Sequence, residues 1–232
     1  MKDDFFKFPS TPHLTILGDI EIRNDKVMSE SDREEFFHHE LIVEEKVDGS
    51  NLGISFDSDG NIRAQNRGQY LDLPAVGQWR KLDDWLSKRA DDLFEHLTDR
   101  YILFGEWCYA QHSVFYNRLP DWFIGFDIYD RQIERFLATK CRDALFKATN
   151  VSYVPTIARG FLTLQEIKKM MSISRFGDQP AEGLYLRVEM DCWLVERAKL
   201  VRPAFIQSID KHWAFSGIKP NKLLIETWDQ GK

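Results

Sequence analysis

Short apolar runs bounded by turn residues recur along the chain and predict β-strands. One such run, Leu41–Val43, leads into the stretch Glu44–Asn51, and another, Leu52–Phe56, leads out of it. Short apolar runs on either side of a glycine are typical of two strands joined by a tight turn. We therefore predict that Lys46 lies at the end of the first strand and that Gly49 bends the backbone.

The next turn signal, Ser58–Asn61, predicts a hairpin into a third strand over residues 62–67. Folding the chain back at this turn places residue 51 or 52 opposite Arg67. We expect Asn51 and Arg67 to lie together, at the same end of the sheet as the lysine of the first strand. Two exposed polar residues would show the same spacing.

Two later apolar strands each carry one carboxylate inside the apolar run. Tyr101–Trp107 contains Glu106, and Asp121–Tyr129 contains Asp127. Burying a carboxylate without a partner is costly, so Glu106 must meet a cation, a metal ion or hydrogen-bond donors. A structural salt bridge would satisfy that requirement as well as a ligand would.

Two segments near the end of the motif region, 181–188 and 192–201, are predicted to form an antiparallel hairpin around a turn at Glu189–Asp191. That register places Glu182 opposite Lys199 at the open end of the hairpin. An ordinary cross-strand ion pair would look the same and would stabilise the fold by only about 0–1 kcal/mol.

Helical spacing and capping signals separate these strands. Apolar residues between Val76 and Leu97 recur at helical intervals and predict one or two helices whose tryptophans pack in the core. The predicted fold class is therefore α+β, with antiparallel sheets packed against helices. The other predicted helices cover 31–39 and 163–171, with capping boxes at Ser31 and Thr163, 139–147, with Thr139 as the cap, and 204–213, which follows Pro203.

The composition is that of a globular protein. The 232 residues are 43% hydrophobic and carry a formal net charge of -6, so the chain is not a general polyanion binder and needs a local basic groove to contact nucleic acid. Its three cysteines lack a CxxC pair, which predicts a reducing compartment and no structural zinc site. No apolar run is long enough to span a bilayer, and we expect a cytoplasmic protein.

Six short motifs follow one another in order between about Leu41 and Phe205. They are Lys46-Val47-Asp48-Gly49-Ser50-Asn51, Asn66-Arg67-Gly68, Phe104-Gly105-Glu106, Phe126-Asp127, Glu182-Gly183-Leu184 and Arg197-Ala198-Lys199. This ordered set resembles the covalent nucleotidyltransferase superfamily of polynucleotide ligases and RNA capping enzymes. Within it, the chain is most similar to the ATP-dependent RNA ligases of the second phage-type class.

The resemblance implies an adenylation domain with a nucleotide groove between its sheets, and a role for each motif. Lys46, in the KxDGxN motif, would be the nucleophile that takes AMP covalently from ATP, and Lys199 and Arg67 would also be catalytic. Lys199 and Mg²⁺ could help to keep Lys46 neutral by repulsion. The implied nucleotide contacts are Glu45 and Lys46, Asn51 near the phosphate or its metal, Arg67, Glu106 on the ribose hydroxyls, Phe126 stacked on adenine, Glu182, and Arg197 and Lys199 at the phosphates.

Two cofactors follow from the resemblance, ATP and a divalent metal ion, Mg²⁺ or Mn²⁺, that Glu182 would help to organise. The family's last motif is commonly Lys-x-Lys, and Arg197 at its first position keeps the charge but changes the geometry. The implied reaction joins a 5′-phosphate end of RNA to a 3′-hydroxyl end. A DNA ligase, a GTP-dependent capping-type guanylyltransferase and a catalytically inactive nucleotide- or RNA-end-binding module stay open as alternatives.

Only a short stretch, residues 206–232, follows the last motif. We therefore expect a single adenylyltransferase domain over residues 1–232, without an appended oligonucleotide-binding barrel, and this leaves room for a protein partner that supplies grip on RNA. The basic residues that could line an RNA track are Arg63, Arg67, Arg118, Arg175, Arg202 and Lys211.

Overall fold

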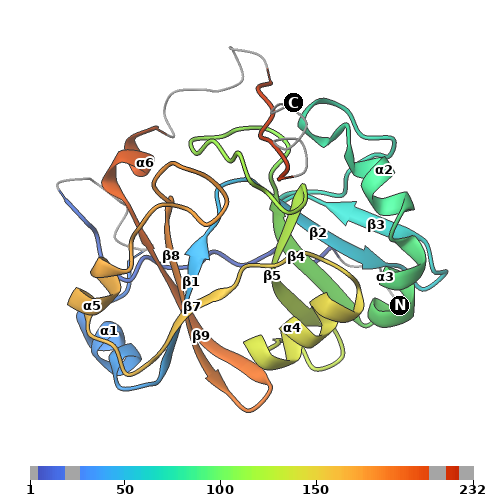
Figure 1. Cartoon of the computed structure of the whole chain (residues 1–232). Coiled ribbons are helices and arrows are strands. Elements are labelled where there is room, and N and C mark those ends of the chain that lie inside the picture. Colours follow the sequence, from blue (N-terminus) through green and yellow to red (C-terminus); the bar gives the residue numbers. More distant parts are fainter. Residues whose placement is uncertain (1–4, 19–26, 209–217, 225–232) are drawn as a thin grey trace.

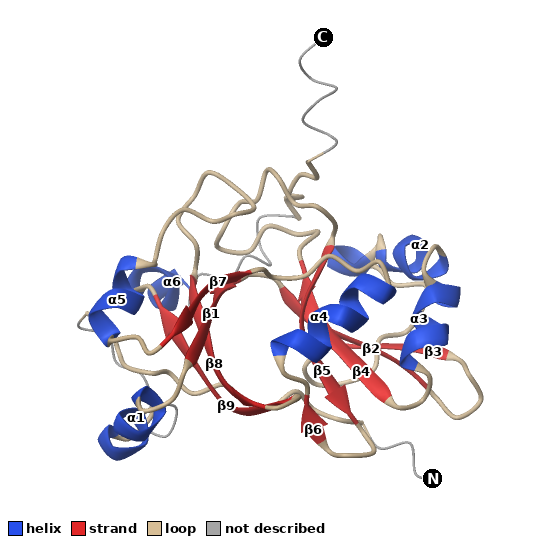
Figure 2. Cartoon of the chain, turned by 60° about the horizontal axis from the view of Figure 1, so that its bottom comes forward, coloured by secondary structure: helices blue, strands red, loops and turns tan. Residues whose placement is uncertain are grey.

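The structure is a computed structural model that describes residues 5–18, 27–208 and 218–224. Two antiparallel β-sheets face each other, and helices pack around them (Figure 1 and Figure 2). The first sheet has the strand order β7-β1-β8-β9, and the second has the order β3-β2-β4-β5-β6. This arrangement confirms the predicted α+β class.

The first sheet combines strands from distant parts of the sequence, whereas the second uses consecutive segments. The first sheet consists of β1 (Leu41–Lys46), β7 (Thr156–Gly160), β8 (Gly183–Met190) and β9 (Trp193–Val201). The second consists of β2 (Ser50–Phe56), β3 (Ile62–Gln65), β4 (Tyr101–Trp107), β5 (Phe123–Asp130) and β6 (Arg135–Phe136).

The helices divide between the two sheets. Phe36 of α1 and Ile167 of α5 pack into the core of the first sheet, whereas Trp85 of α2, Leu93 of α3 and Phe146 of α4 pack into that of the second. Among the described helices, none combines the length and apolar character that crossing a bilayer requires. Their bounds are α1 (Glu30–Phe37), the 3-10 helix η2 (Gly77–Trp79), α2 (Leu82–Ser87), α3 (Ala90–Leu97), α4 (Thr139–Ala148), α5 (Leu164–Lys169) and α6 (Pro203–Ser208).

The bend at Gly49 is present as predicted, but β1 and β2 belong to different sheets. The expectation that Lys46 shares a sheet with Asn51 and Arg67 is therefore wrong, because the bend carries the chain from the first sheet to the second. A larger residue there would have to push its neighbours aside, since an added Cβ would lie 3.0 Å from the carbonyl oxygen of Trp107. The bend thus places the lysine and Asn51 on opposite sides of the space between the sheets.

The predicted hairpin between β2 and β3 is confirmed, with Gly53 paired to Gln65. Gly60 takes a positive φ of 81°, which glycine adopts without strain. The carboxylate of Asp57 accepts hydrogen bonds from the backbone N–H groups of Asp59 and Asn61 and so stabilises the turn. β3 ends at Gln65, and the chain then turns, with the N–H of Asn66 donating to the carbonyl of Gln69, so Arg67 lies in a turn beyond the paired residues.

The β8–β9 hairpin is also present, but its register differs from the predicted one. The strands turn tightly after Met190, which pairs with Trp193, and the register shifts again at a bulge after Val188. As a result Tyr185, not Glu182, lies opposite Lys199. The predicted register assumed a three-residue turn at Glu189–Asp191 and no bulge, so it could not anticipate the tighter turn or the shift after Val188.

Helix starts were predicted with mixed success. The capping box at Thr163 is confirmed, and α6 begins at Pro203; the part of the predicted helix beyond Ser208 lies outside the described residues. At α1 the cap is Ser29 rather than Ser31, because the Ser29 hydroxyl accepts from the N–H of Asp32. At α4 Thr139 is not the cap. Instead, the carboxylate of Glu189 in β8 accepts hydrogen bonds from the backbone N–H and the hydroxyl of Thr139, at 2.8 and 2.9 Å.

One further expectation needs correction. Cys141 of α4 and Cys192 of the β8–β9 turn form a disulfide bond, so the expectation of reduced cysteines is wrong for this pair. The sequence could not show that α4 and this turn meet. Residues 218–224, near the end of the described chain, pack against the body of the protein, where the buried side chain of Asn221 donates to the carbonyl of Cys108 and accepts from the N–H of Tyr116.

A buried network of charged side chains joins the two sheets. Arg187 of β8 pairs with Asp127 of β5 at 2.5 Å. Arg142 of α4 makes a two-pronged pair with Glu44 of β1, at 2.6 and 3.0 Å. All four side chains have 0% exposure, so each charge depends on its partner for compensation. We call Glu44, Asp127, Arg142 and Arg187 the inter-sheet network.

We predict that Arg187→Met lowers the free energy of unfolding by about 3–5 kcal/mol, because it leaves Asp127 buried with part of its charge uncompensated. Urea denaturation followed by circular dichroism measures this loss. Arg33→Met is the matched control, since the ion pair that the described residues give Arg33 is with the exposed Glu30, at 3.7 Å, and its loss should cost less than about 1 kcal/mol. Equal, small losses in both variants would contradict the role of the network.

Candidate active site

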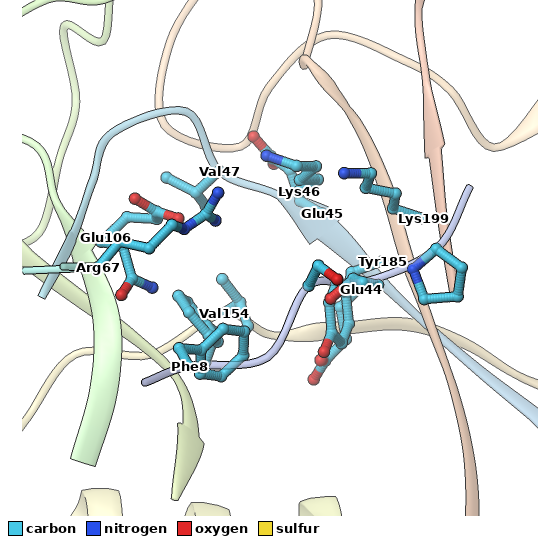
Figure 3. A pocket seen from close by; sticks show the side chains of 15 residues that line it. Phe8, Glu44, Glu45, Lys46, Val47, Arg67, Glu106, Val154, Tyr185 and Lys199 are labelled. Carbon is cyan, nitrogen blue, oxygen red and sulfur yellow. The ribbon is translucent and has the colours of Figure 1, made fainter. Parts of the chain in front are cut away.

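A pocket between the two sheets brings together most of the predicted site residues (Figure 3). Lys46 and Lys199 lie together in Figure 3, Glu106 and Arg67 lie across the pocket from them, and Phe8 and Tyr185 lie below both pairs in this view. The predicted residues that line it are Glu45, Lys46, Asn51, Arg67, Glu106, Phe126 and Lys199. Glu182 reaches the pocket through its bond to Lys46, whereas Arg197 is not part of the lining.

Lys46 ends β1, and its Nζ donates a hydrogen bond of 2.6 Å to the carboxylate of Glu182. Burial alone would lower the pKa of Lys46, but the negative charges of Glu182 and Glu106 outweigh burial and raise the pKa. The free protein therefore carries an ammonium group here. The expectation that nearby positive charges keep Lys46 neutral is not met in the free site, because its dominant neighbours are carboxylates.

Asp48 fixes the bend that follows Lys46. Its carboxylate accepts hydrogen bonds from the backbone N–H groups of Ser113 and Val114, at 2.7 and 2.8 Å. Its own N–H donates to the hydroxyl of Tyr116 at 2.7 Å. The aspartate of the KxDGxN motif thus holds the bend to the 113–116 segment, and with it the direction of the lysine.

Asn51 of β2 and Glu106 of β4 are directly paired across the second sheet and both line the pocket. Oδ1 of Asn51 and Oε2 of Glu106 are buried and have no hydrogen-bond partner within the described part of the chain. Buried acceptors without a donor are costly, which indicates a ligand that brings hydroxyl or amine groups to this side of the pocket. Hydroxyl groups of a sugar have the required chemistry.

Burial raises the pKa of Glu106 to about 8; the charge of Lys46 opposes this rise, and that of Glu182 adds to it. Glu106 thus meets the predicted need for a partner only in part, through the nearby charges of Lys46 and Arg67. A carboxyl group with this pKa carries a proton for much of the time near neutral pH, so it can donate as well as accept a hydrogen bond.

Two aromatic rings form the other end of the pocket. The ring centres of Phe126 in β5 and Tyr185 in β8 are 6.5 Å apart, with planes inclined by 39°. The hydroxyl of Tyr185 donates to Asp127 at 3.2 Å, and burial raises its pKa to about 12, so this side chain stays neutral. Sequence reasoning missed Tyr185, although strand alternation places it on the same face of β8 as Arg187.

Lys199 of β9 lies close to Lys46 at the charged end of the pocket (Figure 3). Arg197, two residues earlier, has a different environment. Its guanidinium pairs with Asp127 at 3.2 Å and lies over the rings of Phe8 and Phe136, at 4.7 and 4.5 Å from their centres. That Arg197 contacts the phosphates stays a prediction. This geometry does not favour it, because Asp127 and the rings of Phe8 and Phe136 hold the side chain.

Glu45 borders the pocket, but its carboxylate points to the other face of the first sheet. There it accepts hydrogen bonds from the Ser174 hydroxyl and the Arg175 N–H, at 2.5 and 2.9 Å. Consecutive residues of a strand alternate between faces, so Glu45 and Lys46 cannot both direct their side chains inward. The side chain of Glu45 anchors the loop that precedes Glu182, and its nucleotide contact stays a prediction.

In the described residues, no group of three or more His, Cys, Asp or Glu side chains is placed to hold a metal ion. This finding is compatible with Mg²⁺, which is usually bound through one or two carboxylates together with substrate phosphates. Glu182 fits such a role as a carboxylate at the charged end of the pocket.

The family model for RNA ligases matches residues 39–201. The chain belongs to the RNA ligase family. No curated protein sequence matches it significantly.

Solved structures of Naegleria gruberi RNA ligase share the fold. The structure with PPi matches with a TM-score of 0.60 at 21% sequence identity and covers 91% of this chain and 64% of that one. A mutant with AMP and Mn matches with a TM-score of 0.61 at 21% identity, covering 89% and 65%. A mutant with ATP and Mn gives a TM-score of 0.59 at 21% identity, and this chain spans only 53% of its length. The predicted fold class is confirmed.

We predict that Glu106→Gln changes how stability depends on pH. With its pKa raised from 4.5 to about 8, Glu106 binds a proton in the folded protein over a pH range in which the unfolded chain releases it. The free energy of unfolding therefore falls as pH rises through this range, and Gln removes that contribution. Urea denaturation from about pH 5 to about pH 8, the range between the two pKa values, should show that the free energy of unfolding depends less on pH in the variant than in the wild type.

Glu34→Gln serves as the control, because Glu34 is exposed on α1 and lies outside the pocket. Its pH dependence should follow that of the wild type. If Glu106→Gln also follows the wild type, the carboxyl group of Glu106 does not hold the extra proton.

Proposed function

We propose that this chain is an ATP-dependent RNA ligase that joins 5′-phosphate and 3′-hydroxyl ends through an AMP group carried on Lys46. The observation that carries the proposal is one pocket in which Lys46 meets Glu182 while Asn51 and Glu106 present unsatisfied acceptors. Membership of the RNA ligase family supports the same reaction class. The matched Naegleria ligase has been solved with ATP and Mn and with AMP and Mn, which supports these ligands for this pocket.

The pocket has a suitable group for each part of ATP. Its base would lie at the aromatic end, against Phe126 and Tyr185. The ribose hydroxyls would donate to the unpartnered oxygens of Asn51 and Glu106. The phosphates would then lie at the charged end, beside Lys46 and Lys199. In this orientation one ligand satisfies the buried acceptors and neutralises the positive charges.

In the proposed first step, Nζ of Lys46 attacks the α-phosphorus of ATP. A nitrogen–phosphorus bond forms, the bond to the bridging oxygen breaks, and pyrophosphate leaves with the electron pair. The ammonium form has no lone pair, so Lys46 must first release one proton to solvent, and the nitrogen releases a second proton to solvent once the nitrogen–phosphorus bond has formed. Separation of the Lys46–Glu182 pair is thus the activating event in the protein.

Glu182 is also the residue that would hold Mg²⁺ or Mn²⁺, together with the phosphates of ATP. When bound, the ion supplies positive charge next to the phosphate oxygens, where negative charge develops. Lys199 adds a second positive charge from the chain itself. The side chain of Lys46 is left free to act as a nucleophile because Glu182 then has another partner.

In the later steps AMP would pass from Lys46 to the 5′-phosphate of RNA, and the 3′-hydroxyl would displace AMP as the strand is sealed. Arg67, in the pocket lining, is the candidate contact to the RNA end. Of the other basic residues predicted to form an RNA track, Arg63, Arg118 and Arg202 make contacts within the protein. Lys211 lies outside the described residues. A protein partner that supplies further grip on RNA stays part of the proposal.

We predict that Lys46→Met abolishes covalent AMP attachment while the fold persists. The wild type, incubated with ATP and Mg²⁺, should gain the mass of one AMP group by intact-protein mass spectrometry and release pyrophosphate. Incubation with GTP should give no adduct, which separates the ligase from a capping-type guanylyltransferase. Lys88→Met, at an exposed position at the end of α2, is the control and should be labelled like the wild type.

An AMP adduct on the Lys46→Met variant would show that another residue is the nucleophile. Measurable ATP binding by the wild type without any adduct would instead favour an inactive nucleotide-binding module.

A further inference from the structure

The N-terminal segment 6–14, which we call the strap, crosses from one sheet to the other along the pocket. At one end the side chain of Gln65, in β3, donates a hydrogen bond of 2.8 Å to the carbonyl of Phe6. At the other end the strap pairs with β9, because Lys199 donates to the carbonyl of Pro12 at 2.9 Å and Leu14 donates to that of Lys199 at 2.8 Å. Figure 3 shows the segment passing between Phe8 and Lys199.

Phe8 is the apolar part of the strap inside the pocket. It is only 6% exposed, and its ring meets that of Phe126 edge to face at 5.3 Å. The rings of Phe104 and Phe136 support it at 5.0 and 5.5 Å, and the guanidinium of Arg197 lies 4.7 Å from its centre. Phe8 is therefore held rigidly against the ring that we assign to the base.

The next residues of the strap bring polar groups to the same pocket. Ser10 and Thr11 both line it. Neither hydroxyl has a hydrogen-bond partner among the residues that the structure describes. An apolar wall next to a few polar groups is the usual construction of a small-molecule site, where the polar groups fix orientation and specificity.

We infer that the strap is the base-recognising wall of the nucleotide pocket. Phe8 positions the ring of Phe126 against the face of the base, and the hydroxyls of Ser10 and Thr11 form hydrogen bonds to its edge. This inference rests on the proposed function, because it takes the ligand to be ATP with its base at the aromatic end. None of the six motifs includes the strap, so it adds a recognition element to the pocket.

The strap also has a fixed relation to the phosphate end. Both backbone groups of Lys199 take part in its pairing with the strap. Two backbone hydrogen bonds therefore join the strap, which we assign to the base, directly to Lys199, which we assign to the phosphates. Contacts at the base should be needed for ATP itself and should not matter for a ligand that has only phosphates.

The test compares ATP with inorganic tripolyphosphate, which has no base. We predict that Ser10→Ala/Thr11→Val raises KM for ATP in lysyl-AMP formation by roughly 3- to 30-fold, the loss expected for one or two hydrogen bonds. The inhibition constant of tripolyphosphate should stay within about twofold of the wild-type value, since no hydrogen bond to phosphate is removed. Phe8→Ala should show the same split, and circular dichroism checks that each variant is folded.

Lys7→Ala is the matched control, because Lys7 lies in the strap but is exposed and does not line the pocket. It should change neither constant. Equal changes for ATP and tripolyphosphate in the double variant would assign the strap a purely structural role, and a wild-type KM would show that its hydroxyls do not contact the base. Either result overturns the inference about the strap. The proposed function would still stand if the wild type forms the AMP adduct. A wild type that forms no adduct refutes both.

Discussion

The buried pairing of Arg187 with Asp127 is the interaction on which the pocket depends. It joins the two sheets directly, and the Arg142–Glu44 pair joins β1 to α4 beside it. Side chains that point into the space between two sheets are normally apolar, but here four charged groups with 0% exposure lie there. Because each pair needs close contact, the network sets the spacing between the sheets. That spacing leaves Lys46 and Lys199 on one side of a cavity and Asn51 and Glu106 on the other.

Local patterns were sufficient for most elements but not for their partners. The strands around Lys46 and Glu106, the β2–β3 hairpin and the Thr163 capping box all form where the sequence predicts them. The apolar runs on either side of Gly49 carry no information about which strand each will pair with, so their assignment to separate sheets was not predictable. The register of β8 and β9 depends on a bulge after Val188, which leaves no mark in the alternation of residue types.

The site shows a similar division. Charged residues in short motifs are easily seen in a sequence, and Lys46, Asn51, Glu106 and Lys199 do meet in one pocket. The direction of a charged side chain is harder to predict, as Glu45 and Arg197 show: the first is turned outward by strand alternation, and the second is held by Asp127 and two aromatic rings. Tyr185, Phe8 and the strap were missed because apolar and hydroxyl residues give no motif signal and reach the pocket only through tertiary packing.

If this protein is an RNA ligase, the AMP group that it carries is destined for an RNA end. The most direct measurement uses protein that has first been labelled with AMP and freed of ATP, and then mixes it with a nicked RNA duplex carrying a 5′-phosphate. We expect the label to leave the protein, to appear at the 5′ end and to be released as the strand is sealed, whereas a 5′-hydroxyl nick should leave the label on the protein. Label that stays on the protein in the presence of the 5′-phosphate nick, or that moves only to a DNA nick, would contradict this expectation.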